Sequence, residues 1–266
     1  PEIERSEPED PDFRITYSSQ EEPSFRYSRE KSEIFISGEF DRDIFRHDLS
    51  FMMLPVFARL HSEKGREMIH SSSVQGENSG LIVGSRGAGK SICVTELCYK
   101  GNSILSAEQT LVNRENRIVG GTKTISNRAA CIDKYFDDIE YQKEPGKNPY
   151  EQKVIRTPEE LSFQEGREGD IAAIYFIDIE DTYDLEVSKR ELSEYKTELL
   201  QNINNTVRAT ERTIMNFSKP LPSFDSYLLA EKRLEHIDYL LRESKVMDVK
   251  GNLEDVSRYI NQELKG

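Results

Sequence analysis

Residues 81–91 read LIVGSRGAGKS and contain a complete G-x-x-x-x-G-K-S phosphate-binding loop. In such a loop the glycines let backbone N–H groups turn toward a phosphate, the lysine adds a positive charge, and the serine hydroxyl can bind Mg²⁺. We therefore predict that every residue of the loop contributes to binding a nucleotide: Gly84, Ser85, Arg86, Gly87, Ala88, Gly89, Lys90 and Ser91.

The sequence on either side of this loop fits the order strand, loop, helix that the motif requires. Residues 81–83 form an apolar run typical of a strand buried on both faces. Residues 92–100 have apolar side chains at helical spacing, and Gly101 stands where a helix C-cap is expected. A Rossmann dinucleotide loop does not fit, because Gly87-x-Gly89 is not followed by a third glycine at the required place.

The composition excludes several classes of protein. The chain has 266 residues and a net charge of -13, which argues against a nucleic-acid partner because phosphate backbones are bound by clustered Lys and Arg. It has no signal peptide and no run of about 18 apolar residues, so we expect a cytoplasmic protein with no membrane partner. Cys93, Cys98 and Cys131 lack metal-ligand spacing, and we expect them to pack in the core.

Charge and proline divide the chain into three predicted parts. Residues 1–23 carry eight acidic residues, two basic residues and four prolines, so we predict a mobile acidic arm over residues 1–30, with a regulatory tail as the alternative. A phosphate-loop domain over residues 31–220 follows, and its polar stretch at 137–170 is predicted to be a surface insertion near the site. Residues 221–266 are predicted to be a C-terminal helical extension.

Hydrophobic periodicity predicts the order of the main elements. Strands are expected at residues 32–38, 67–74, 103–113 and 171–179, and helices at residues 43–64, 188–217, 226–244 and 253–264. Pro55 is expected to kink or divide the first helix. Ser188 with Glu191 predicts a capping box at the start of the second.

Two side chains are candidates for a general base. Asp178 follows four apolar residues at the end of the strongest predicted strand, as in a Walker B element, and is the first candidate. His70 lies one strand before the loop and is the second. The structural readings stay open: Asp178 could cap the next turn, and His70 could be a hydrogen-bonded strand residue.

Other polar side chains are candidates for binding metal and phosphate. Glu108 is predicted near the end of a strand adjacent to the loop strand, so we assign Mg²⁺ to Ser91 and Glu108. Arg128 or Lys123 is assigned to the transferred phosphoryl group, although both could be surface charges.

The order of these segments over about residues 60–205 resembles the catalytic domain of bacterial HPr kinase/phosphorylase and the small kinases related to it. The strand containing His70-Ser71-Ser72 precedes the loop, a carboxylate-bearing strand follows the loop helix, and a strand containing Ser126-Asn127-Arg128 comes next. The resemblance implies an α/β fold with the mixed sheet shared by phosphoenolpyruvate carboxykinase, followed here by C-terminal helices.

In function, the resemblance implies transfer of a phosphoryl group from ATP or another nucleoside triphosphate, with Mg²⁺, to a hydroxyl of a small metabolite or peptide. It also makes a homo-oligomer plausible. The chain departs from the family where Ala107-Glu108 replaces two aspartates and where Asn127 precedes Arg128. A nucleotide-binding regulator or scaffold without transfer activity is therefore the alternative, and a hydrolase is a third reading.

Overall fold

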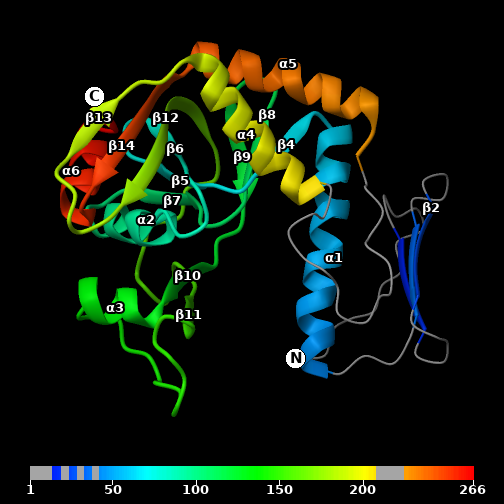
Figure 1. Ribbon diagram of the computed structural model, residues 1–266, viewed down its shortest axis with the longest axis horizontal. Helices are drawn as coiled ribbons and strands as arrows, with labels where there is room; N and C mark the ends of the chain where they lie inside the picture. The colour runs from blue at the N-terminus through cyan, green and yellow to red at the C-terminus, as the bar shows by residue number, and fades with distance from the viewer. Residues whose placement is uncertain (1–13, 19–23, 29–32, 38–41, 208–224) are drawn as a thin grey trace.

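The computed structural model describes residues 14–18, 24–28, 33–37, 42–207 and 225–266 (Figure 1). Its centre is a mixed nine-stranded sheet. The strands follow the order β4 (Arg66–Ile69), β8 (Thr110–Asn113), β9 (Arg117–Gly121), β12 (Gly169–Ile179), β6 (Ser79–Val83), β5 (Ser72–Gln75) and β7 (Ser103–Ser106), with β14 (Lys245–Gly251) beside β12 and β13 (Glu186–Ser188) beside β14. The predicted α/β class is confirmed, and most strand pairs are antiparallel.

Helices cover both faces of this sheet (Figure 1). One face is covered by α2 (Lys90–Tyr99) and α6 (Leu253–Glu263), and the other by α1 (Arg42–Glu63), α4 (Leu192–Val207) and α5 (Tyr227–Glu243). Strand β12 supplies both cores because its side chains alternate: Tyr175 and Ile177 pack on the α2 side, and Ile174 and Phe176 on the α4 side. A small unit of β10 (Ile125–Arg128), α3 (Ala129–Tyr135) and β11 (Lys153–Arg156) adjoins α2.

Several predicted elements are confirmed. The strands at 33–37 and 169–179 and the helices α1, α2, α5 and α6 lie where the periodicity placed them. Pro55 lies inside α1, which continues as one helix on both sides of it, so the predicted division there is wrong. No helix in the described ranges is both long and apolar enough to span a bilayer.

Two predicted strands are each interrupted. Residues 67–74 form β4 and β5, which pair with different partners, and the break falls at His70. Residues 103–113 form β7 and β8, with a break from Ala107 to Gln109. In the second break the Thr122 Oγ1 accepts hydrogen bonds of 3.0 Å from the backbone N–H groups of Glu108 and Gln109, so a side chain bonds these two groups in place of a neighbouring strand.

The C-terminal part is not wholly helical, because β14 enters the central sheet parallel to β12. The capping box predicted at Ser188 is also wrong. Ser188 is the last residue of β13, where it pairs with Asp248, and α4 begins at Leu192. The predicted continuation of this helix beyond residue 207 lies outside the described residues.

The N-terminal region contains regular structure that its composition did not predict. Strands β1 (Arg14–Ser18) and β2 (Ser24–Ser28) pair on either side of β3 (Glu33–Ser37). Ile34 and Ile36 of β3 are buried, so two apolar side chains organise this small sheet. The rest of the predicted acidic arm lies outside the described residues.

Candidate nucleotide site

The glycine-rich loop lies tightly against the carboxyl end of β12. A Cβ on Gly84 would come within 2.7 Å of the carbonyl oxygen of Ile177, and one on Gly89 within 2.8 Å of the Ile179 Cβ. The Ile179 N–H also donates to the Ala88 carbonyl at 3.1 Å. Gly87 and Gly89 adopt φ angles of 94° and 90°, a region that favours glycine. The glycine spacing of the motif is therefore explained by backbone conformation and close packing.

Lys90 is the first residue of α2 and is buried at the loop. Its Nζ donates hydrogen bonds to the carbonyls of Gly84 at 2.8 Å and Ser85 at 3.0 Å, so the side chain folds back over the loop. The N-terminus of α2 has no acidic residue in its first turn and no side-chain cap, since Gly89 is the N-cap. Its first N–H groups and its partial positive charge therefore favour an anion.

A cavity of about 1200 Å³ opens in front of this loop. Its wall includes loop residues 84–87 and 89–91 together with His70, Glu108 and Arg128. Ala88 is buried and does not line the cavity. The structure therefore brings together most of the residues selected from the sequence, from four separate segments of the chain.

His70 is fixed through its backbone by a helix far away in the sequence. Its N–H donates to the Asn202 Oδ1 at 2.7 Å, and the Asn202 side chain donates back to the His70 carbonyl at 3.1 Å. Burial, followed by the positive charge of Lys90, lowers the pKa of His70 from 6.5 to about 4. The imidazole is therefore neutral at pH 7, with Nδ1 lying 3.3 Å from the Gln109 amide nitrogen.

Glu108 reaches the cavity from a turn and not from a strand adjacent to the loop strand. It follows β7, and β5 lies between β7 and β6 in the sheet. The Ser72 hydroxyl donates to the Ala107 carbonyl at 2.5 Å and holds this turn from the β5 side. No group of three or more potential metal ligands occurs in the described part of the chain. Mg²⁺ commonly uses only one or two protein ligands, so Ser91 and Glu108 in one wall fit it.

Two of the selected residues lie away from the cavity wall. Asp178 is exposed at the end of β12, on the same side of the strand as Phe176, and is not among the wall residues. The Lys123 Nζ donates to the carbonyls of Ile104 at 3.0 Å and Gly166 at 2.6 Å, so this side chain joins two segments of backbone. Neither side chain therefore lines the cavity.

Helix α4 forms one wall of the cavity, and this wall was not predicted from the sequence. The polar residues on this wall recur at every fourth position: Ser193, Thr197, Gln201 and Asn205. Tyr195, Leu199 and Ile203 are buried on the opposite side of the helix. The polar half of this amphipathic pattern was visible in the sequence, but it equally describes a solvated face. Lys153 of β11 was missed as well, within the predicted insertion.

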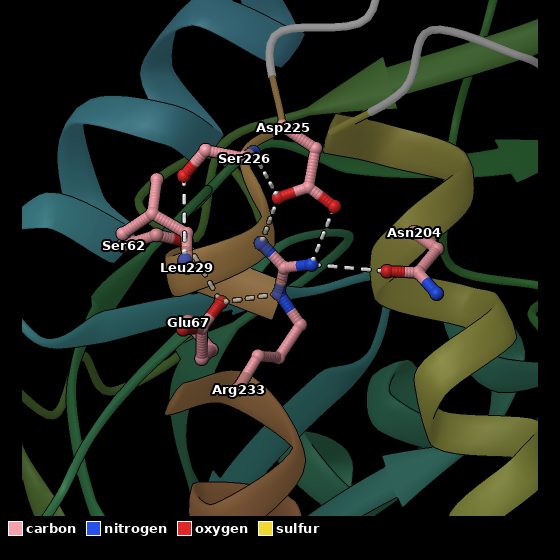
Figure 2. Close-up of polar contacts among 7 residues, drawn as sticks. All are labelled: Ser62, Glu67, Asn204, Asp225, Ser226, Leu229 and Arg233. Atoms are coloured by element: carbon pink, nitrogen blue, oxygen red, sulfur yellow. Dashed lines mark hydrogen bonds and ion pairs between the residues drawn. The ribbon is translucent and has the colours of Figure 1, made fainter. Parts of the chain in front are cut away.

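A buried cluster centred on Arg233 contacts α4 through Asn204 (Figure 2). Its Nε donates to Glu67 at 3.1 Å, and its two terminal nitrogens donate to the Asp225 carboxylate at 3.1 and 3.2 Å. A further bond of 3.0 Å reaches Asn204 of α4, and Ser62 of α1 donates to Glu67 at 2.8 Å. Burial alone would lower the pKa of Arg233, but its bonds to Asp225 and the charge of Glu67 raise it. The cluster joins α1, β4, α4 and α5.

No known protein-family model matches this chain, and no curated protein shows significant similarity to it.

Proposed function

We propose that this protein is a kinase that transfers a phosphoryl group from a nucleoside triphosphate to a hydroxyl group. The observation that carries the proposal is the complete loop, seated on β12 and followed directly by α2, at a cavity large enough for a nucleotide and a second substrate. The resemblance to HPr kinase/phosphorylase catalytic domains supports the same reading. With it we propose the related phosphate-loop kinase fold and a cytoplasmic enzyme.

In this proposal the loop and its neighbours hold the donor phosphates. The backbone N–H groups of residues 84–90, the Lys90 ammonium and the Arg86 guanidinium neutralise the phosphate charge. Ser91 and Glu108 would hold Mg²⁺, which would supply further charge neutralisation. Phosphoryl transfer depends mainly on such positioning and electrostatics, so no covalent role for the protein is required.

The proton of the acceptor hydroxyl needs a nearby acceptor group. His70 and Glu108 both line the cavity, and His70 is neutral at pH 7, so each can accept a hydrogen bond from a hydroxyl group. Asp178, the first candidate from the sequence, stays a prediction that the cavity wall does not support. We assign the positioning of the hydroxyl to His70 and Glu108.

The direct test is transfer of label from a nucleotide labelled on the γ-phosphate to small hydroxyl compounds and peptides. Labelled product from the wild-type protein, and none from Lys90→Ala, would support a kinase. Release of labelled phosphate into water without a labelled acceptor would favour a hydrolase instead.

One observation favours a nucleotide-dependent regulator as the second candidate. Ala107 occupies a position where the resembling family has an aspartate, and its carbonyl is already bonded to Ser72. A regulator would bind the nucleotide without turnover of any acceptor. The same labelling experiment therefore separates the two functions, provided that nucleotide binding is measured on the same sample.

A further inference from the structure

Two cations face each other across the small β10–β11 pair. These strands are antiparallel, and Arg128 is the direct partner of Lys153 in their register. Like charges directly opposite one another in a sheet are unfavourable. The alternate residues Ile125 and Val154 are buried toward the core, so the strands turn the two cations to the other face.

Neither cation forms an ion pair with a carboxylate within the described residues. Arg128 makes one hydrogen bond, which its Nη1 donates to the Tyr150 carbonyl at 2.6 Å. That bond restrains the guanidinium and leaves most of its donors available. The neighbouring Lys134 differs, because it is paired with Asp181. Arg128 and Lys153 therefore lack the carboxylate partner that Lys134 has beside them. This difference points to a ligand that supplies the negative charge.

The pair also lies at the cavity. Arg128 and Lys153 both line its wall, together with Ser126 of the same strand pair. The charge of Lys153 reaches His70, whose pKa it lowers along with Lys90 and Arg86. Cations from the loop and from β11 therefore act on the same small region, although they belong to different structural units.

The donor nucleotide does not require these two cations. Arg86, Lys90 and the N-terminus of α2 already face the phosphate position, and Mg²⁺ accompanies a bound nucleoside triphosphate. Arg128 and Lys153 add two positive charges from a separate strand pair. These two additional positive charges can bind one further anionic group near His70.

We infer that Arg128 and Lys153 form a second anion subsite, which binds a carboxylate or phosphate group of the acceptor. The inference rests on the proposed kinase function and narrows its substrate class to anionic hydroxyl compounds. It competes with the assignment of Arg128 to the transferred phosphoryl group, and the two assignments differ in what they predict for nucleotide affinity.

The test uses the full-length chain and calorimetry. ADP with Mg²⁺ is titrated first, and inorganic phosphate or acetate is then titrated into the ADP-saturated protein at constant ionic strength. We expect at least one of the two anions to bind the wild-type protein, and Lys153→Gln and Arg128→Gln to weaken that binding about tenfold each. Phosphate binding alone would identify a phosphate-bearing acceptor, and binding of both anions would extend the class to carboxylates. Lys143→Gln is the matched control, because Lys143 is exposed, pairs with Asp133 and is not in the wall.

Three outcomes would overturn the inference. The first is that neither anion binds the ADP-saturated protein, and the second is equal anion binding by Lys153→Gln and the wild type. The third is a lower ratio of ATP to ADP affinity in both variants, which would assign the pair to the transferred phosphoryl group. Failure of the wild-type protein to bind ADP at all would instead contradict the proposed function.

Discussion

Arg233 and Arg128 show two opposite ways in which this protein places a guanidinium group. Arg233 is fully buried and bonded to two carboxylates and an amide (Figure 2). Arg128 is exposed at the cavity, opposite Lys153 and bonded to a single carbonyl. A buried charge must find its partners within the fold, whereas an exposed one can leave them to a ligand. We therefore propose that the first arrangement stabilises the fold and that the second binds a ligand.

The largest expected effect comes from breaking the buried cluster. Arg233→Met removes the guanidinium that bonds the buried carboxylates of Glu67 and Asp225, so we expect the free energy of unfolding to fall by about 3–5 kcal/mol. Chemical denaturation monitored by circular dichroism measures the change. Arg242→Met is the matched control on α5, because Arg242 is exposed and its pair with Asp238 should contribute less than about 1 kcal/mol. Equal losses in the two variants would contradict the comparison.

A smaller loss of stability is expected at the break between β4 and β5, where Asn202 of α4 bonds the His70 backbone. Asn202→Leu removes both hydrogen bonds to the His70 backbone, and we expect it to lower the free energy of unfolding by about 1–3 kcal/mol. Gln201→Leu, at the exposed neighbouring position, should change it by less than about 0.5 kcal/mol. If the two variants proved equally stable, the bonds from Asn202 would not hold the break in place.

His70, which lines the cavity, should make the stability of the protein depend on pH. Its pKa is about 4 in the fold against an ordinary 6.5, so protonation favours the unfolded state. The contribution of neutral His70 to the free energy of unfolding is fully present above pH 6.5. It is lost as the pH falls toward 4. Between pH 7 and pH 4 the free energy of unfolding should fall by about 1–3 kcal/mol less in His70→Gln than in the wild type. Chemical denaturation at each pH measures the difference. Parallel pH profiles would show that His70 does not titrate as described.

The smallest effect is expected at the like-charge pair. Lys153→Glu places a carboxylate opposite Arg128, and we expect the free energy of unfolding to rise by about 0.2–1 kcal/mol while anion binding is lost. Lys143→Glu removes the surface ion pair with Asp133 and should not raise the free energy of unfolding. A less stable Lys153→Glu protein would mean that the opposed cations do not repel each other appreciably.

The sequence predicted best where one segment carries its own pattern. The loop residues 84–91 and the buried run of β12 are local, and both appear in the structure as predicted. The breaks at His70 and Ala107 were missed because they depend on Asn202 and Thr122, which lie elsewhere in the chain. Asp178 was selected for its position at a strand end, but pleat direction and the neighbouring turn decide which cavity a side chain reaches.

Strand pairing explains the other omissions. The apolar residues of β14 lie between two strong helical patterns, and only its pairing with β12 identifies them as a strand. Lys153 became a site residue because β11 pairs with β10, and nothing in the polar stretch 137–170 specifies that register.

The central claim is that the cavity at the loop binds a nucleoside triphosphate, and calorimetric titration of ATP with Mg²⁺ tests it most directly. We expect saturable binding by the wild-type protein and a loss of at least about tenfold in Lys90→Ala, which removes the ammonium beside the loop. Lys100→Ala removes the same charge from the opposite end of α2 and should bind as the wild type does. Equal affinities of the wild-type and Lys90→Ala proteins, or no binding by either, would contradict the account.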